Sequence, residues 1–256
     1  MSTSEPAGGA GRVAIVTGAA GAFGSAYSRA LVGAGYAVVA VDTRAADELV
    51  KELVDSGGQA LALECDVSSR TACEAMAAAA LEEFGRIDVL INNAAYFSTI
   101  VKQPFEEISD DEWDLAFAVN VRGAWLCTRA VAPTMRAQGG GRIINTSSMT
   151  LHGGVVPGFA HYVSTKAAIV GLTGALAREL GKDNIAVNTI SPDYVEHDGP
   201  MFERQPEMAP HLAAQRSFAR EMVPEDLVGT MLFLAGEGSS FVTGQDIWVN
   251  GGRLVP

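Results

Sequence analysis

Residues 12–42 read RVAIVTGAAGAFGSAYSRALVGAGYAVVAVD, and this segment decides the fold. Its apolar start predicts a buried strand, and the glycine-rich GAAGAFG that follows predicts a tight turn. The alanine-rich stretch after the turn predicts a helix that ends at Gly35, where glycine suits a left-handed cap. The next apolar run, YAVVAVD, predicts a second buried strand that ends in Asp42. Strand, turn, helix and strand in this order predict a βαβ unit with glycines in its first turn.

The same unit predicts a dinucleotide site. Gly18 permits a tight turn and Gly24 permits close packing of the helix, whose exposed amino-terminal amides can hold a pyrophosphate. Asp42 lies where a carboxylate can accept hydrogen bonds from both ribose hydroxyls of an adenosine. This carboxylate would repel a 2′-phosphate, which favours NAD over NADP, although the nearby Arg44 weakens the preference. A plain strand-to-helix turn is the alternative interpretation of the glycines.

The alternation of strands and helices continues along the chain. Further strands are predicted at residues 59–66, 87–95, 141–147, 183–193 and 243–252, and helices at 46–56, 69–84, 109–137, 161–181 and from residue 224. Asn92 and Asn93 close an apolar strand, at the edge where a ligand binds in an open parallel sheet. We expect residues 12–256 to form one α/β domain with a substrate loop at about 193–215, after a disordered lead at residues 1–11.

A second segment, NTSSMTLHGGVVPGFAHYVSTK at residues 145–166, carries the candidate catalytic groups. Helical spacing places Tyr162 and Lys166 one turn apart on one face. A free phenol has a pKa of about 10, and a nearby ammonium favours the phenolate, so the pair can transfer protons. Ser147 or Ser148 follows an apolar strand and can hydrogen-bond a substrate oxygen. The pattern predicts an alcohol or carbonyl site; an isolated YxxxK is more often an ordinary helix tyrosine and a solvated lysine.

Composition narrows the classes of partner. The chain has 256 residues, of which 48% are hydrophobic and 19% charged, as in a soluble globular protein with one sizeable core. A net charge of −12 argues against nucleic acid and anionic membranes as partners. No apolar run approaches the ~20 residues of a membrane span, and the amino end lacks the pattern of a signal peptide. Three cysteines without metal-site spacing predict no metal and a reduced, cytoplasmic location.

With TGAAGAFG, NNAA, Asn120, Ser148, Tyr162 and Lys166 in this order, the chain resembles the classical short-chain dehydrogenases/reductases. The resemblance implies a Rossmann-like, doubly wound, seven-stranded parallel sheet in the order 3-2-1-4-5-6-7, with helices on both faces. It also implies a homo-tetramer, and hydride transfer between a nicotinamide and an alcohol or carbonyl carbon. In this pattern Tyr162 is the general acid/base, Lys166 lowers its pKa, Ser148 donates to the substrate oxygen and Asn120 is a relay, with helix packing as the alternative role for Asn120.

The resemblance also implies the residues around the two ligands. The expected cofactor residues are Gly18, Gly21, Ala22, Phe23, Gly24, Asp42, Asp66, Val67, Asn93, Tyr162, Lys166, Pro192 and Val195. The expected substrate residues are Tyr96, Met149, Leu151, Phe159, Tyr194 and Phe202, and Phe97 and Met201 fall on the same segments. Together they would make an apolar, aromatic-tolerant pocket, although core or lid packing is the alternative for each. His152 is expected as an exposed loop histidine that could reach a substrate.

Three departures from the family pattern stand out. Ala22 replaces the middle glycine of TGxxxGxG and Phe23 replaces an aliphatic residue, so the loop is more crowded, although Gly21 could relieve the turn. The family's Pro-Gly after the sixth strand is Pro192-Asp193 here, and His197 stands in place of a threonine. Ser148 precedes Tyr162 by one residue more than is typical, with Ser147 as the second choice.

These features predict an NAD-dependent oxidoreductase acting on a secondary alcohol or ketone, aromatic or alicyclic. Within the family, the motifs are most similar to those of enzymes that act on 1-phenylethanol-type or pyridoxal-type alcohols. An NADPH-dependent carbonyl reductase and a non-catalytic NAD(H)-binding regulator are the alternatives. The intact Ser148, Tyr162 and Lys166 argue against a regulator, which has no need of all three.

Overall fold

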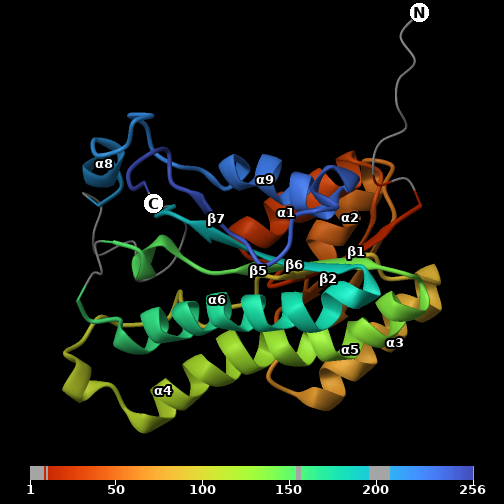
Figure 1. The fold of residues 1–256 in the computed structure, drawn as a ribbon, viewed down its shortest axis with the longest axis horizontal. Helices are drawn as coiled ribbons and strands as arrows, with labels where there is room; N and C mark the ends of the chain where they lie inside the picture. The colour runs from red at the N-terminus through yellow and green to blue at the C-terminus, as the bar shows by residue number, and fades with distance from the viewer. Residues whose placement is uncertain (1–8, 10, 154–156, 196–207, 256) are drawn as a thin grey trace, which may run out of the picture.

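The computed structural model describes residues 9, 11–153, 157–195 and 208–255. Seven parallel strands form one sheet in the order β3-β2-β1-β4-β5-β6-β7 (Figure 1), as the resemblance implied. The strands are β1 (Val13–Thr17), β2 (Ala37–Asp42), β3 (Ala60–Glu64), β4 (Val89–Asn92), β5 (Gly141–Thr146), β6 (Ile185–Pro192) and β7 (Asp246–Val249).

The centre of the sheet is apolar on both faces. β1 lies between β2 and β4, with Val13 opposite Ala37 and Ala14 opposite Val89. Every residue of β1, β2 and β4 is buried. Parallel strands covered by helices on both sides need continuous apolar runs, which is why these segments read as such in the sequence.

Helices cover the sheet in two layers (Figure 1). One layer contains α1 (Ala22–Gly33), α2 (Asp47–Asp55) and α9 (Val228–Ala235), and the other contains α3 (Arg70–Phe84), α4 (Asp110–Phe117), α5 (Ala124–Ala137) and α6 (Ala160–Leu180). The short α8 (Met208–Ala213) lies near the end of the molecule where the strands finish. Two cores result: Tyr27 and Leu31 of α1 pack with α2 and α9 on one face, and Met76 of α3 packs with α5 on the other.

The chain reverses its direction of travel across the sheet after β3, when it crosses to β4 on the other side of β1. Ligands bind open α/β sheets at such a switch point, outside the carboxyl ends of the strands. The fold therefore brings the loops after β1, β2, β4, β5 and β6 to one edge.

Some element boundaries differ from the sequence-based expectation. The helix predicted at 109–137 is interrupted by a π-helical turn, Ala118–Gly123, between α4 and α5. The loop predicted at 193–215 contains α8, and residues 196–207 of that loop lie outside the described residues. A 3₁₀ turn, Pro224–Leu227, precedes α9, because proline suits the first turn of a helix.

Candidate active site

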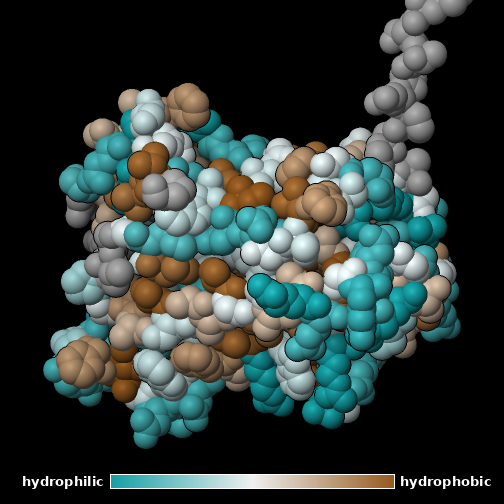
Figure 2. Space-filling model, viewed as in Figure 1, coloured by the Kyte–Doolittle hydropathy of each residue, from teal (hydrophilic) through white to brown (hydrophobic). Residues whose placement is uncertain are grey.

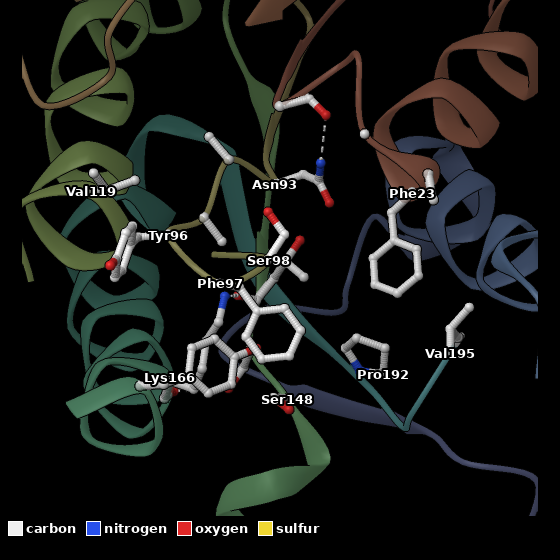
Figure 3. A pocket seen from close by; sticks show the side chains of 18 of the residues that line it. Phe23, Asn93, Tyr96, Phe97, Ser98, Val119, Ser148, Lys166, Pro192 and Val195 are labelled. Carbon is white, nitrogen blue, oxygen red and sulfur yellow. Dashed lines mark hydrogen bonds between the residues drawn. The ribbon is translucent and has the colours of Figure 1, made fainter. Parts of the chain in front are cut away.

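A cleft of about 990 Å³ opens at the carboxyl edge of the sheet. Almost all of the expected cofactor residues line it: Gly18, Gly21, Ala22, Phe23, Asp42, Asp66, Val67, Asn93, Tyr162, Lys166, Pro192 and Val195. Gly24 does not line the cleft, since it is buried beneath the turn. In Figure 3, Phe23, Pro192 and Val195 lie on one side of the cleft, and Tyr96, Phe97 and Lys166 on the other.

Helix α6 and the end of β5 bring the candidate catalytic groups together. Tyr162 and Lys166 lie one turn apart on α6 and are 6% and 3% exposed. The Nζ of Lys166 donates to the carbonyl oxygen of Thr146 at 2.8 Å and lies 5.5 Å from the centroid of the Tyr162 ring. The carbonyl oxygen at the end of β5 therefore holds the Lys166 ammonium close to the Tyr162 ring.

Burial dominates the ionisation of both groups. Desolvation raises the pKa of Tyr162 above its usual value, and a hydrogen bond with the Ser148 side chain offsets only part of this rise. Desolvation lowers the pKa of Lys166 to about 8. At neutral pH, Tyr162 is therefore a phenol that can donate a proton, and Lys166 is still mostly an ammonium.

The two serines at the end of β5 have different partners. The Oγ of Ser147 donates to the carbonyl oxygen of Lys166 at 2.8 Å, which ties β5 to α6. The Oγ of Ser148 accepts from the backbone and side chain of Thr150 at 3.2 and 3.0 Å, so its own proton remains for another acceptor. Its hydrogen bond with Tyr162 makes Ser148 the serine placed to contact a substrate oxygen.

Asn120 lies behind the cleft, in the π-helical turn. Its Oδ1 accepts from the backbone N–H of Tyr96 at 2.7 Å. Its Nδ2 donates to the Oγ of Thr165 at 3.0 Å and to the Tyr96 carbonyl at 3.3 Å. This side chain holds the loop after β4 against α6, which is a positioning contact, and it does not line the cleft.

The nucleotide end of the cleft is built from β1, α1 and β4. Gly18 has φ +66°, and a Cβ there would lie 2.9 Å from the Cα of Ala94. The Nδ2 of Asn93 donates to the carbonyl oxygens of Thr17 and Gly18 at 3.0 and 3.1 Å, which fixes this turn. The amino end of α1 begins after Gly21 without a side-chain cap. Backbone amides at such an end can bind an anion such as a pyrophosphate.

Asp42 is held rigidly at the tip of β2. Its carboxylate is 8% exposed and accepts from the backbone N–H groups of Ala20 at 3.0 Å and Arg44 at 3.1 Å. The Nε of Arg44 lies 3.6 Å away, and its side chain is 70% exposed. Further along, Asp66 accepts from Ser68, and Val67 packs against Gly123. The residues present fit an adenosine ribose and a pyrophosphate.

The opposite end of the cleft is apolar and aromatic. The ring of Phe97 lies 4.4 Å from that of Tyr162, and Phe159 packs on both rings at 6.4 Å. Tyr96, Met149 and Tyr194 also line this end. Leu151 does not, because the 3₁₀ turn Met149–Leu151 places Met149 against the cleft two residues earlier. The expected residues Met201 and Phe202, and also His197, lie outside the described residues.

His152 differs from the exposed loop histidine that we expected. Its Nε2 lies 2.7 Å from the Oδ2 of Asp246, and its ring is 4.2 Å from that of Trp248. The side chain is 16% exposed and joins the loop after β5 to β7. It does not line the cleft.

Two cationic residues of the cleft were missed. Lys102 lines the substrate end, with its Nζ 5.3 Å from the centroid of the Phe159 ring, and burial lowers its pKa. Arg253 lines the same cleft from the carboxyl-terminal segment and pairs with Asp193. In the sequence, Asp193 is visible only as a departure from the family's Pro-Gly. A carboxylate at that position is the one sequence signal for the cation that pairs with it.

The described residues contain no cluster of histidine, cysteine or acidic side chains that could hold a metal ion. Among these same residues, no helix has the length and apolarity to cross a bilayer.

Comparison with known proteins agrees with this geometry. A family model described as enoyl-(acyl carrier protein) reductase matches residues 18–253. A subunit of a (2S)-[(R)-hydroxy(phenyl)methyl]succinyl-CoA dehydrogenase from Thauera aromatica is 36% identical, over 94% of this chain and 96% of its own. A 3-oxoacyl-[acyl-carrier-protein] reductase from Thermotoga maritima is 34% identical, over 96% and 98%.

A solved structure is similar over nearly its whole length. A short-chain type dehydrogenase/reductase from Mycobacterium marinum superposes with a TM-score of 0.90 at 31% identity, covering 98% of both chains. The chain belongs to the classical short-chain dehydrogenase/reductase family. It is therefore an oxidoreductase of a family that binds a nicotinamide cofactor.

Proposed function

We propose that this short-chain dehydrogenase/reductase transfers a hydride between NAD(H) and a secondary alcohol or ketone, with an aromatic or alicyclic substrate. The observation that carries the proposal is the convergence of Ser148, Tyr162 and Lys166 in one cleft that ends at Asp42. When bound, the nicotinamide supplies the hydride donor or acceptor.

The chain's own groups handle the substrate oxygen and its proton. In reduction, the Tyr162 hydroxyl gives its proton to the carbonyl oxygen as this oxygen becomes a hydroxyl, and in oxidation the proton returns. Ser148 donates a hydrogen bond to the same oxygen and orients the carbonyl carbon. The Lys166 ammonium stabilises the phenolate that remains after reduction, from a position set by the Thr146 carbonyl.

The substrate class follows from the walls of the cleft. Phe97, Phe159 and Met149 place aromatic and apolar surface beside Tyr162, which suits a ring next to the reacting carbon. The relatives from T. aromatica and T. maritima are named for substrates carried on coenzyme A or on acyl carrier protein. Their names agree with a hydroxyl or carbonyl as the reacting group and leave the remainder of this chain's substrate open.

The choice of NAD rests on Asp42. Its carboxylate is held in place by two backbone N–H groups, so it cannot turn away from a 2′-phosphate. The exposed Arg44 favours the second candidate, an NADPH-dependent carbonyl reductase, because its guanidinium could pair with that phosphate.

Exchanging the charge at Asp42 tests this choice. In Asp42→Asn the shape is kept and the repulsion is removed, so kcat/KM for NADP+ relative to NAD+ should rise by about tenfold or more. Arg44→Gln is the matched control and should lower the use of NADP+ alone. A wild-type protein that prefers NADP+, with a ratio unchanged in Asp42→Asn and lowered in Arg44→Gln, would favour the second candidate.

We also propose a cytoplasmic homo-tetramer with a small-molecule substrate. The three cysteines are buried free thiols, which suits a reducing compartment. Large apolar side chains are exposed on both helical layers, including Trp113 and Trp125 on one and Phe233 on the other, which suits two separate subunit contacts.

A further inference from the structure

Asp193, directly after β6, is shared by the buried Arg216 and the partly buried Arg253. The Nε and Nη2 of Arg216 donate to its Oδ2 at 3.2 and 3.0 Å. The Nε of Arg253 donates to Oδ2 at 2.9 Å and its Nη2 to Oδ1 at 2.8 Å. The side chains of Asp193 and Arg216 are each 3% exposed, and that of Arg253 is 10% exposed.

This cluster has one positive charge in excess. Asp193 is the only carboxylate within ion-pair distance of either guanidinium among the described residues. Arg216 completes its hydrogen bonds with the carbonyl oxygens of Tyr194 and Arg220. Burying an unmatched charge is costly unless a counter-charge and hydrogen bonds compensate for the lost hydration. One further negative charge would therefore balance the charge of this cluster.

The missing anion is expected on the side of Arg253. The Nη1 of Arg253 has no hydrogen-bond partner among the described residues, and Arg253 lines the cleft while Arg216 does not. Its Nε and Nη2 are fixed on Asp193, so the guanidinium is oriented in advance and loses little side-chain entropy when a ligand binds.

The charge of the cleft differs between its two ends. The carboxylates of Asp42 and Asp66 line the nucleotide end, where the adenosine is expected, and Arg44 offsets one of these two charges. Lys102, Lys166 and Arg253, with one carboxylate, Asp193, line the cleft near the catalytic tyrosine and the loop after β6. The charges of Lys166 and Arg253 together exceed that of Asp193, and in a protein with a net charge of −12 this local positive charge attracts an anionic substrate.

We propose that Arg253 binds an anionic oxygen group, a carboxylate or a phosphate, carried by the substrate away from its reacting carbon. This inference rests on the proposed function for the position of the reacting carbon. The Asp193–Arg216 pair serves to position Arg253, and Arg253 determines the preference for charged over neutral substrates.

Binding of matched ligands tests the proposal without requiring turnover. The probes are 4-acetylbenzoate, its methyl ester and 4-acetylphenyl phosphate, titrated calorimetrically into the full-length protein with and without saturating NAD+. We expect one of the two anions to bind at least about tenfold more tightly than the ester, as a hydrogen bond to a charged group provides. The more tightly bound anion identifies the group.

Arg253→Gln should lower this ratio of anion to ester affinity towards one. The variant leaves Asp193 and Arg216 as a neutral pair, so it should fold, which a thermal melt checks. Arg220→Gln removes one exposed positive charge outside the cleft and should keep the ratio. Equal affinities for anion and ester in the wild-type protein would overturn the proposal. So would a loss of NAD+ affinity in Arg253→Gln with the anion preference retained, since Arg253 would then serve the cofactor.

Failure of the proposed function gives a different result. In that case none of the three ketones is reduced with NADH, whatever the ratio of affinities. Reduction of the ester at a rate equal to that of the acid leaves the proposed function intact and contradicts the anion site alone.

Discussion

The pair Tyr162 and Lys166 shows how burial decides what a side chain can do. Helical spacing is enough to place the two residues together, but their ionisation depends on how far the surrounding protein buries them. Both are almost completely buried, so desolvation moves their pKa values apart, upward for the phenol and downward for the ammonium. Lys166 therefore titrates before Tyr162 as the pH rises.

This order of titration predicts a pH profile. Because the pKa of Lys166 is lowered to about 8, the ammonium is charged below this pH and loses its charge above it. Tyr162 remains protonated through the same range, since its pKa is raised. We expect kcat/KM for ketone reduction to be level below about pH 7 and to fall above about pH 8.

The control for this profile is Lys166→Met, measured over the same range. It should reduce more slowly and lose the inflection near pH 8, because no group at that position titrates. A wild-type profile that stays level to pH 10 would show that the charge of Lys166 is not required.

Several site residues could be predicted because their chemistry is local in sequence. Tyr162 and Lys166 share one helix, and Asp42 closes an apolar strand, so their positions follow from spacing alone. The ion cluster of Asp193, Arg216 and Arg253 could not be predicted in this way, because its members are far apart in sequence and meet only in the fold. Leu151 was placed wrongly because a single 3₁₀ turn decides which side chain faces the cleft.

The turn from β1 into α1 is the element that sets the cofactor end of the cleft. Gly18 and Gly24 are in contact across this turn, and a Cβ on Gly24 would lie 2.2 Å from the Gly18 oxygen and 2.7 Å from the Cα of Ala19. A Cβ on Gly21 would meet only the Gly18 oxygen, at 3.3 Å. Gly21 therefore has room for a methyl group and Gly24 does not, although both belong to one motif.

Alanine substitution should separate these two glycines. Gly24→Ala forces backbone atoms apart, and overpacking of this kind costs about 1–3 kcal/mol, so the free energy of unfolding should fall by that amount and NAD+ should bind more weakly. Gly21→Ala should cost less than about 1 kcal/mol. Urea unfolding followed by circular dichroism measures both, and equal losses in the two variants would contradict this view of the turn.

The π-helical turn between α4 and α5 is a feature that the apolar pattern of the sequence does not predict. The apolar spacing of residues 109–137 predicts one helix, and the chain is helical throughout. The residues of Ala118–Gly123 show no sequence signature of this turn, in which Asn120 contacts Tyr96 and Thr165, residues of the loop after β4 and of α6. π-helical turns occur often at functional sites.

The surface of the molecule carries apolar side chains on both helical layers. Figure 2 shows hydrophobic residues exposed over α9, where Phe233 is 45% exposed and nearby Phe241 is fully exposed. On the other layer, Trp113 and Phe117 of α4 stack at 5.3 Å, and Arg129 lies over the ring of Trp125. Two separate apolar faces allow two kinds of two-fold contact, as a tetramer with three two-fold axes requires.

A charged side chain introduced on one of these apolar faces should therefore split the proposed tetramer into dimers. The double variant Phe233→Glu/Phe241→Glu should convert the proposed tetramer into a dimer of about twice the 26.7 kDa of one chain, as measured by light scattering after size exclusion. Val54→Glu, on α2 of the same layer, also changes a half-exposed apolar residue and should leave the mass unchanged. A tetramer that persists in the double variant would exclude this face as an interface.

The overall architecture was predictable because it depends on many residues that agree. Seven apolar runs, alternating with amphipathic helices and opened by a glycine turn, leave few topologies for one chain of this size, and the resemblance then supplied the strand order. The contacts made by loops depend on single residues, and these are the features that the structure added.

The most direct test of the account is Tyr162→Phe, assayed for ketone reduction with NADH and for NAD+ binding by calorimetry. Removal of one hydroxyl oxygen leaves the packing of the ring against Phe97 in place, so the protein should fold and bind NAD+ as the wild type does. If Tyr162 transfers the proton, kcat should fall by about 100-fold or more. Unchanged turnover in Tyr162→Phe would contradict the assignment, and a wild-type protein that binds NAD+ without turning over any alcohol or ketone would favour a regulator.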